Sequence, residues 1–198
     1  MAERKKFAKV AVTDLDVVNP YFRTRDVREL LEAADVKLIA PEGKLGTSDL
    51  PIVSGAIYGV IQNPEYRLII DVGGDQDGAI ALGQYYNDLQ GTDYQMYFVI
   101  NANRPLVNDL AGVTNAITRI ESVSRIRVTG LINNTHLGPD TTNKDIKKGI
   151  ELTEAVSVKL NIPFLYTTID ERFITTTREI ADFNKVFYIE RYLKLPWE

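Results

Sequence analysis

The chain has 198 residues, a formal net charge of −4, no cysteine and a single histidine, His136. This length fits one domain that can bury most of its apolar surface. The acidic balance argues against broad binding to nucleic acid. Without cysteine the chain has no disulfides, thiolate metal sites or cysteine nucleophiles, and one histidine excludes every multi-histidine metal site.

The beginning of the chain has no targeting pattern. The first nine residues, MAERKKFAK, are charged and lack the apolar core of a signal peptide. No apolar run approaches the roughly 20 residues that cross a bilayer. We therefore expect a cytoplasmic protein that does not bind a membrane.

In chain order, short apolar runs alternate with longer stretches of helical period. The runs that predict buried parallel strands are 9–13, 36–40, 67–71, 95–101, 126–133 and 163–167. The stretches that predict helices are 24–34, 50–62, 78–89, 106–123 and 141–160. This alternation predicts a three-layer α/β/α fold with a mostly parallel sheet, in one domain over residues 1–198, with a less regular tail from Phe183.

Polar residues follow five of the six predicted strands. The segments are Asp14-Leu-Asp16, Asp71-Val-Gly73-Gly74, Asn101-Ala-Asn103-Arg104, Asn133-Asn134-Thr135-His136 and Thr167-Thr168-Ile-Asp170. Ligands of parallel sheets bind outside the carboxyl ends of the strands. Burying polar side chains without a partner costs free energy, so polar residues at the buried carboxyl ends of strands predict a polar ligand site at that edge of the sheet.

Each element of this pattern also has a purely structural interpretation. Asp75 or Asp77 is well placed to cap the helix that follows, and Gly73-Gly74 suits a tight turn. Asn133-Asn134 suits a turn with left-handed geometry, and a lone His136 favours a surface position.

Together, the same residues favour phosphate chemistry. An apolar strand that ends in Asp71 and continues into Gly73-Gly74 is a Walker B arrangement, whose carboxylate holds a magnesium ion through water. The glycines let backbone N–H groups approach a terminal phosphate. Asp14 and Asp16, two apart on an extended segment, can share one face, and the Asn134 amide can bind a base edge.

From these motifs, the chain resembles the MinD/ParA-like (SIMIBI-class) P-loop ATPases, and within them the cobyrinic-acid-synthase/MinD/ParA nucleotide-binding group. The matching stretches, from about residue 8 to about residue 170, are VAVTDLDVVNPYFRTRD, LIIDVGGDQDGAIALGQYY, FVINANRP and VTGLINNTHLGPDTT. The resemblance implies ATP and Mg²⁺ as cofactors.

The resemblance also implies a role for individual residues. Asp14 and Asp16 match the switch I acidic pair, and Asp71 matches the Walker B carboxylate, so catalysis is expected at Asp14 and Asp16 and the metal at Asp71 and Asp14. The expected nucleotide-binding residues are Gly73, Gly74, Asn101, Arg104 and Asn134.

One departure from the family affects both fold and activity. No G-x-x-x-x-G-K-[ST] motif occurs, and the string Pro41–Thr47 is better interpreted as a loop. The family's first strand–loop–helix is therefore missing. Its strand lies near the middle of the sheet, so we expect a rearranged sheet or an obligate oligomer. Loss of the loop and its lysine predicts negligible ATP turnover, with nucleotide binding weak or absent.

Other functions stay open at this point. A haloacid-dehalogenase-like phosphatase would use Asp14 as nucleophile and Asp16 as acid–base, with Asp75 and Asp77 as magnesium ligands, but residues 17–70 lack the expected Ser/Thr and Lys strand-end motifs. A non-catalytic binding or scaffold protein would keep the α/β fold and bind nucleotide weakly or not at all. A manganese-dependent sugar-nucleotide transferase has only the Asp14-Leu-Asp16 motif in its favour. The expected partners are a nucleotide and a second copy or another protein.

Overall fold

The computed structural model describes residue 3 and residues 6–15, 27–39, 55–175 and 185–192. The second switch I carboxylate, Asp16, and the string Pro41–Thr47 lie outside these residues. The chain divides into two compact units, the first of Met1–Tyr94, Val123–Arg125 and Tyr192–Glu198 and the second of Gln95–Ser122 and Ile126–Arg191. The single domain expected for residues 1–198 stays a prediction.

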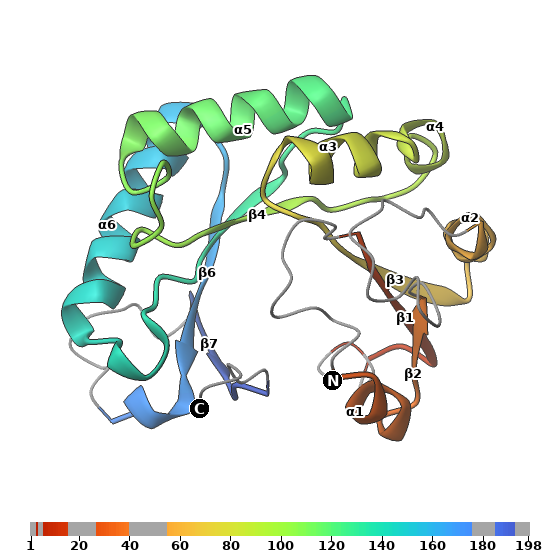
Figure 1. Cartoon of the computed structure of the whole chain (residues 1–198), viewed down its shortest axis with the longest axis horizontal. Coiled ribbons are helices and arrows are strands. Elements are labelled where there is room, and N and C mark those ends of the chain that lie inside the picture. Colours follow the sequence, from red (N-terminus) through yellow and green to blue (C-terminus); the bar gives the residue numbers. More distant parts are fainter. Residues whose placement is uncertain (1–2, 4–5, 16–26, 40–54, 176–184, 193–198) are drawn as a thin grey trace. The chain divides into compact units, whose positions relative to one another are not determined.

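The first unit contains a three-stranded parallel sheet of order β2-β1-β3 (Figure 1). Its strands are β1 (Lys9–Asp14), β2 (Val36–Ile39) and β3 (Tyr66–Asp71). Its helices are α1 (Arg28–Ala33), α2 (Ala56–Ile61), α3 (Gln76–Gly83) and α4 (Tyr86–Leu89). All three strands match the sequence predictions to within one residue at each end. β1 and β2 contain buried residues, whereas every residue of β3 is at least partly exposed.

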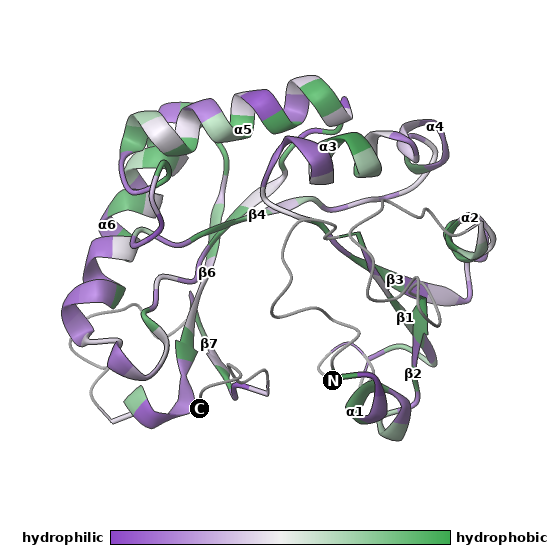
Figure 2. Ribbon diagram, viewed as in Figure 1, coloured by the Kyte–Doolittle hydropathy of each residue, from purple (hydrophilic) through white to green (hydrophobic). Residues whose placement is uncertain are grey.

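The second unit contains a four-stranded parallel sheet of order β4-β5-β6-β7. Its strands are β4 (Tyr97–Ile100), β5 (Gly130–Asn133), β6 (Phe164–Asp170) and β7 (Val186–Ile189). The helices α5 (Leu110–Ser124) and α6 (Asn143–Leu160) are banded green and purple in Figure 2, as amphipathic helices are. The expected α/β fold with parallel strands and flanking helices is thus confirmed, with the strands in two sheets.

One face of the second sheet is covered by α5 and α6. Its core consists of Ile100, Val113, Ile117, Val128, Leu131 and Val156. The other face of the sheet carries exposed side chains. In the register of the strands, Val99 of β4 is paired with Ile132 of β5, Ile132 with Tyr166 of β6, and Thr168 of β6 with Phe187 of β7. Val99, Tyr166 and Phe187 are 54%, 45% and 47% exposed. A parallel sheet ordinarily has helices on both faces.

Several elements differ from the sequence predictions, and three of the differences concern how an element divides, where it begins or whether it was expected. The helix expected over 78–89 divides into α3 and α4, because Arg125 donates a hydrogen bond to the Gly83 carbonyl, which a continuous helix would pair with the next turn. The strand expected from Ile126 begins only at Gly130, because the Val128 amide donates to Glu121 Oε1 instead of to a neighbouring strand. The tail, expected to be irregular, contributes β7.

No helix in the described part of the chain combines the length and the apolar character needed to cross a bilayer.

Candidate functional site

In the first unit, the carboxyl ends of β1 and β3 bring two carboxylates side by side. Asp14 and Asp71 are register partners, and the Leu15 amide donates to the Asp71 carbonyl at 2.7 Å. Asp14 is 6% exposed, whereas Asp71 is exposed. Two carboxylates on one face of a sheet edge are hard oxygen donors of the kind that Mg²⁺ prefers. Among the described residues, no group of three or more His, Cys, Asp or Glu forms a fuller metal site.

A tight glycine turn follows β3. Asp75 caps α3 by accepting a hydrogen bond from the Gly78 amide at 2.9 Å, so the capping interpretation of Asp75 is the one that the structure bears out. A Cβ on Gly78 would lie 2.3 Å from the Gly73 carbonyl oxygen, and one on Gly74 would meet nothing within 4 Å. Backbone of the turn thus packs directly on the first turn of the helix. This cap role gives no support to Asp75 as a phosphatase metal ligand.

In the second unit, hydrogen bonds join the segments that follow β4, β5 and β6. The Asn101 side chain donates to the His136 carbonyl at 3.2 Å and accepts the His136 amide at 3.4 Å. Thr168 Oγ1 donates to Asn134 Oδ1 at 2.7 Å, which fixes the orientation of the Asn134 amide. The Asn134 amide nitrogen has no partner among the described residues, and its oxygen keeps a second lone pair. The Asn134 side chain can therefore both donate to and accept from a base edge.

A network of buried hydrogen bonds anchors the segments that follow β4 and β5. The Thr135 amide and hydroxyl both donate to Asn133 Oδ1, at 3.1 and 2.7 Å, and the Ala102 amide donates to Thr135 Oγ1 at 3.0 Å. Asn133 and Thr135 pack against Gly149 of α6, where a Cβ would lie 2.2–2.3 Å from their oxygens. In the Asn133-Asn134 dipeptide, the buried Asn133 therefore anchors the loop, whereas Asn134 is partly exposed.

The start of α6 is tied to the segment after β4. Asp145 Oδ2 accepts the amide of the N-cap residue Thr142 at 2.9 Å and its hydroxyl at 2.6 Å. Asp145 Oδ1 accepts from Asn103 Nδ2 at 2.9 Å, and Lys148 Nζ donates to the Ala102 carbonyl at 2.7 Å. The Thr142 hydrogen bonds, with Asn103 and Lys148, hold the pKa of Asp145 below its usual value. The helix expected over 141–160 therefore begins with a capping box between Thr142 and Asp145.

This lowered pKa gives a pH-dependent prediction. A carboxylate whose folded pKa lies below its unfolded value of about 4 stabilises the fold above that value and loses its effect as pH falls through the folded pKa. We expect Asp145→Asn to reduce the free energy of unfolding by about 1 kcal/mol at neutral pH. In chemical denaturation the difference from the wild type should vanish well below pH 4. The exposed carboxylate Asp140, changed to asparagine, is the control, and an equal loss there would contradict the assignment.

The structure thus distributes the predicted site residues between two groups. Asp14, Asp71, Gly73 and Gly74 lie in the first unit. Asn101, Arg104 and Asn134 lie in the second. Asp16 lies outside the described residues, and the roles of all these residues remain predictions. Sequence reasoning placed Thr168 among the polar strand ends but did not identify it as the partner of Asn134. It missed the contacts of Asp145 and Lys148 with the segment after β4, which join residues more than 40 positions apart.

Comparisons with known proteins show likeness at the level of the fold. No family model matches the chain, and no curated protein matches it in sequence. The solved structure of FtsY from Mycoplasma mycoides is similar to it, with a TM-score of 0.53 and 19% identity. The match covers 85% of this chain and 52% of the FtsY chain, so this chain spans about half of that protein's length. The chain therefore shares the α/β fold of the part of FtsY that it matches.

Proposed function

We propose that this chain is a nucleotide-binding domain of the MinD/ParA-like group that binds ATP with Mg²⁺. The observation that carries the proposal is the register pair Asp14–Asp71, two carboxylates at one sheet edge directly before a glycine turn. This donor set fits Mg²⁺, which would neutralise phosphate charge when bound. The likeness of the fold to FtsY is consistent with a nucleotide site of this kind.

The other predicted residues have roles in this proposal. Asp71 would hold the ion through water and Asp14 would lie beside it, and Asp16, which lies outside the described residues, would complete the acidic pair. The backbone of Gly73 and Gly74 approaches the terminal phosphate, since a turn without side chains leaves its N–H groups accessible. In the second unit, Asn134 is held by Thr168 in an orientation suited to a base edge, and Asn101 and Arg104 belong to the same set of loops.

We further propose that the chain lacks the family's first strand–loop–helix unit. Two features of the fold support this. The strands at the ends of the two sheets, β2 and β3 in the first unit and β4 and β7 in the second, each have an edge that pairs with no other described strand. Helices α5 and α6 cover one face of the second sheet and leave Val99, Tyr166 and Phe187 exposed on the other. Open edges and a bare apolar face are what the loss of one central strand and its helix leaves behind.

Without the phosphate loop and its lysine, the site loses positioning and charge stabilisation worth several kcal/mol. We expect Mg-ATP to bind only at millimolar concentrations by isothermal titration calorimetry, with ATP hydrolysis at buffer background. Asp71→Ala should weaken the Mg²⁺-dependent part of the binding, whereas Asp77→Ala, on the exposed first turn of α3, should not. Mg-GTP is titrated alongside to identify the base.

Two outcomes would count against this proposal. Hydrolysis above background that disappears in Asp71→Ala would contradict inactivity. Absence of any heat with either nucleotide, in a chain that is folded by circular dichroism, would favour the non-catalytic scaffold.

A further inference from the structure

The strand ends of the second unit share one local hydrogen bond. At each of them a side-chain oxygen accepts the backbone N–H of the residue two positions later, as Asn and Asp do in Asx turns. The bonds, of 3.0, 3.1 and 3.0 Å, join Asn101 to Asn103, Asn133 to Thr135, and Asp170 to Arg172. They fix the backbone at the carboxyl ends of β4, β5 and β6.

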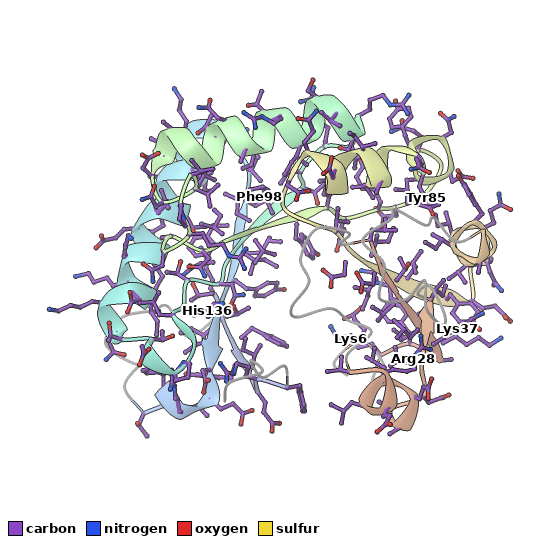
Figure 3. All side chains as sticks on the ribbon, viewed as in Figure 1. Lys6, Arg28, Lys37, Tyr85, Phe98 and His136 are labelled. Carbon is purple, nitrogen blue, oxygen red and sulfur yellow. The ribbon has the colours of Figure 1, made fainter. Side chains whose placement is uncertain are left out.

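The loop between β5 and α6 repeats this arrangement with an imidazole as the acceptor. The Gly138 amide donates to His136 Nδ1 at 3.1 Å, again across two positions. Nδ1 of a histidine and Oδ1 of an asparagine are both bonded to Cγ, so the two side chains can close the same turn. His136 is labelled in Figure 3 on the segment between β5 and α6. To accept this bond, the ring is neutral and carries its proton on Nε2.

The imidazole differs from an amide in how it responds to pH. An asparagine oxygen accepts a hydrogen bond at every pH, whereas both nitrogens of a protonated imidazole are donors. Protonated His136 would direct Nδ1–H at the Gly138 N–H, and the hydrogen bond between them would be lost. Histidine ordinarily titrates near pH 6.5, so this loss falls within the range that proteins meet in cells.

The turn that follows His136 depends on side chains. Its backbone hydrogen bonds are long, with both the Asp140 amide to the Leu137 carbonyl and the Thr141 amide to the Gly138 carbonyl at 3.3 Å. The shorter bonds come from Thr141 Oγ1, which accepts the Leu137 amide at 2.9 Å and donates to the Gly138 carbonyl at 2.7 Å. The His136 ring contributes a further side-chain bond, so its loss should loosen the 3₁₀ turn over Gly138–Asp140.

The backbone of His136 itself is held in place from β4. The Asn101 side chain donates to the His136 carbonyl at 3.2 Å and accepts the His136 amide at 3.4 Å. These two bonds do not involve the ring, so protonation leaves them intact. The ring and the residues after it are therefore the parts that respond.

Charged groups on the neighbouring segments affect where the ring titrates. Desolvation, and then the positive charges of Arg104 after β4 and Arg191 after β7, lower the pKa of His136. The other charged residues at this end of the unit are Asp140 in the loop and Asp170 and Arg172, of which Arg172 donates to the Gly138 carbonyl. With a lowered folded pKa, the neutral ring stabilises the loop above about pH 6.5, and this stabilisation is lost as the pH falls through the folded value.

We propose that protonation of His136 opens the turn over Gly138–Asp140, so that the loop between β5 and α6 is a pH-sensitive element of the fold. The neutral ring closes the turn as an asparagine would, and the charged ring releases it. The proposal concerns the loop alone, and it holds whether or not the chain binds a nucleotide.

The chain has a single histidine, so the ring signals in an NMR spectrum of ¹⁵N-labelled protein belong to His136. At neutral pH we expect the ring nitrogen shifts of the Nε2–H tautomer and a scalar coupling between Gly138 N and His136 Nδ1 across the hydrogen bond. On acidification the coupling should disappear as the ring titrates. The amide signals of residues 137–141 should shift with the same midpoint, whereas those of α5 should not.

Two variants separate protonation from other effects of pH. His136→Asn keeps an acceptor on Cγ that does not titrate, so residues 137–141 should keep their neutral-pH signals down to about pH 5. His136→Leu has no acceptor, so these signals should be insensitive to pH and lie near the acid positions of the wild type. Absence of the coupling at neutral pH, or a loop that does not titrate with the ring, would overturn the proposal. A pH response of His136→Asn equal to that of the wild type would do so as well.

Discussion

Replacing Gly78 with alanine is expected to lower the free energy of unfolding of the first unit by about 2–3 kcal/mol. The new Cβ would lie 2.3 Å from the Gly73 carbonyl oxygen, 2.8 Å from its carbon and 2.9 Å from its Cα. These are backbone atoms, which no side-chain rotation can move aside. Relief of the clash also separates the Gly78 amide from Asp75 Oδ1, so the cap of α3 is lost with it.

Gly74→Ala is the matched control in the same turn. A Cβ there meets nothing within 4 Å, and Gly74 is not among the glycines of positive φ, so we expect no loss and up to about 1 kcal/mol of gain. Urea unfolding followed by circular dichroism, with hydrogen exchange over residues 66–83, measures both variants. Equal stabilities for the two variants would show that the turn is not packed on the helix as described.

The sequence predicted most of the strands because their signal is local. In the first unit, β-branched runs bounded by polar residues predicted β1, β2 and β3 to within one residue at each end. The runs also place Asp14 and Asp71 at the carboxyl ends of two strands, and the register of β1 and β3 pairs these two residues. Strand-end reasoning works here because parallel strands bring their carboxyl ends to the same side.

The errors arise where distant residues decide the local structure. The break between α3 and α4 depends on Arg125, some 40 residues later, and the late start of β5 depends on the Glu121 side chain. β7 is a short run of β-branched and aromatic residues, VFYI, inside a tail that was expected to be irregular, and it pairs with β6. The orientation of Asn134 depends on Thr168, which no spacing rule identifies.

The exposed face of the second sheet bears on two explanations for the absence of a phosphate-loop motif. The absence of the G-x-x-x-x-G-K-[ST] motif could reflect a degenerate loop in an otherwise complete fold. The exposed Val99, Tyr166 and Phe187 on the sheet face opposite α5 and α6 are consistent with the proposed loss of a whole structural unit. The proposal is therefore that a structural unit is absent, and phosphate binding is lost with it.

A longer chain should recover that binding, with the largest effect expected for this protein. We expect a chain extended by a strand, a phosphate loop and a helix to bind Mg-ATP at least about 100-fold more tightly than residues 1–198, because loop amides and a lysine contribute several charge-assisted hydrogen bonds. The added strand and helix should also stabilise the fold, since they bury sheet edges and apolar side chains that are now exposed.

The measurement that tests this most directly begins with the DNA that precedes the Met1 codon in frame. The account predicts that it encodes a strand followed by G-x-x-x-x-G-K-[ST], and that calorimetry on the extended protein shows the tighter Mg-ATP binding, lost again in Asp71→Ala. An in-frame stop codon without such a motif, or an extended protein that binds Mg-ATP no better than residues 1–198, would contradict it.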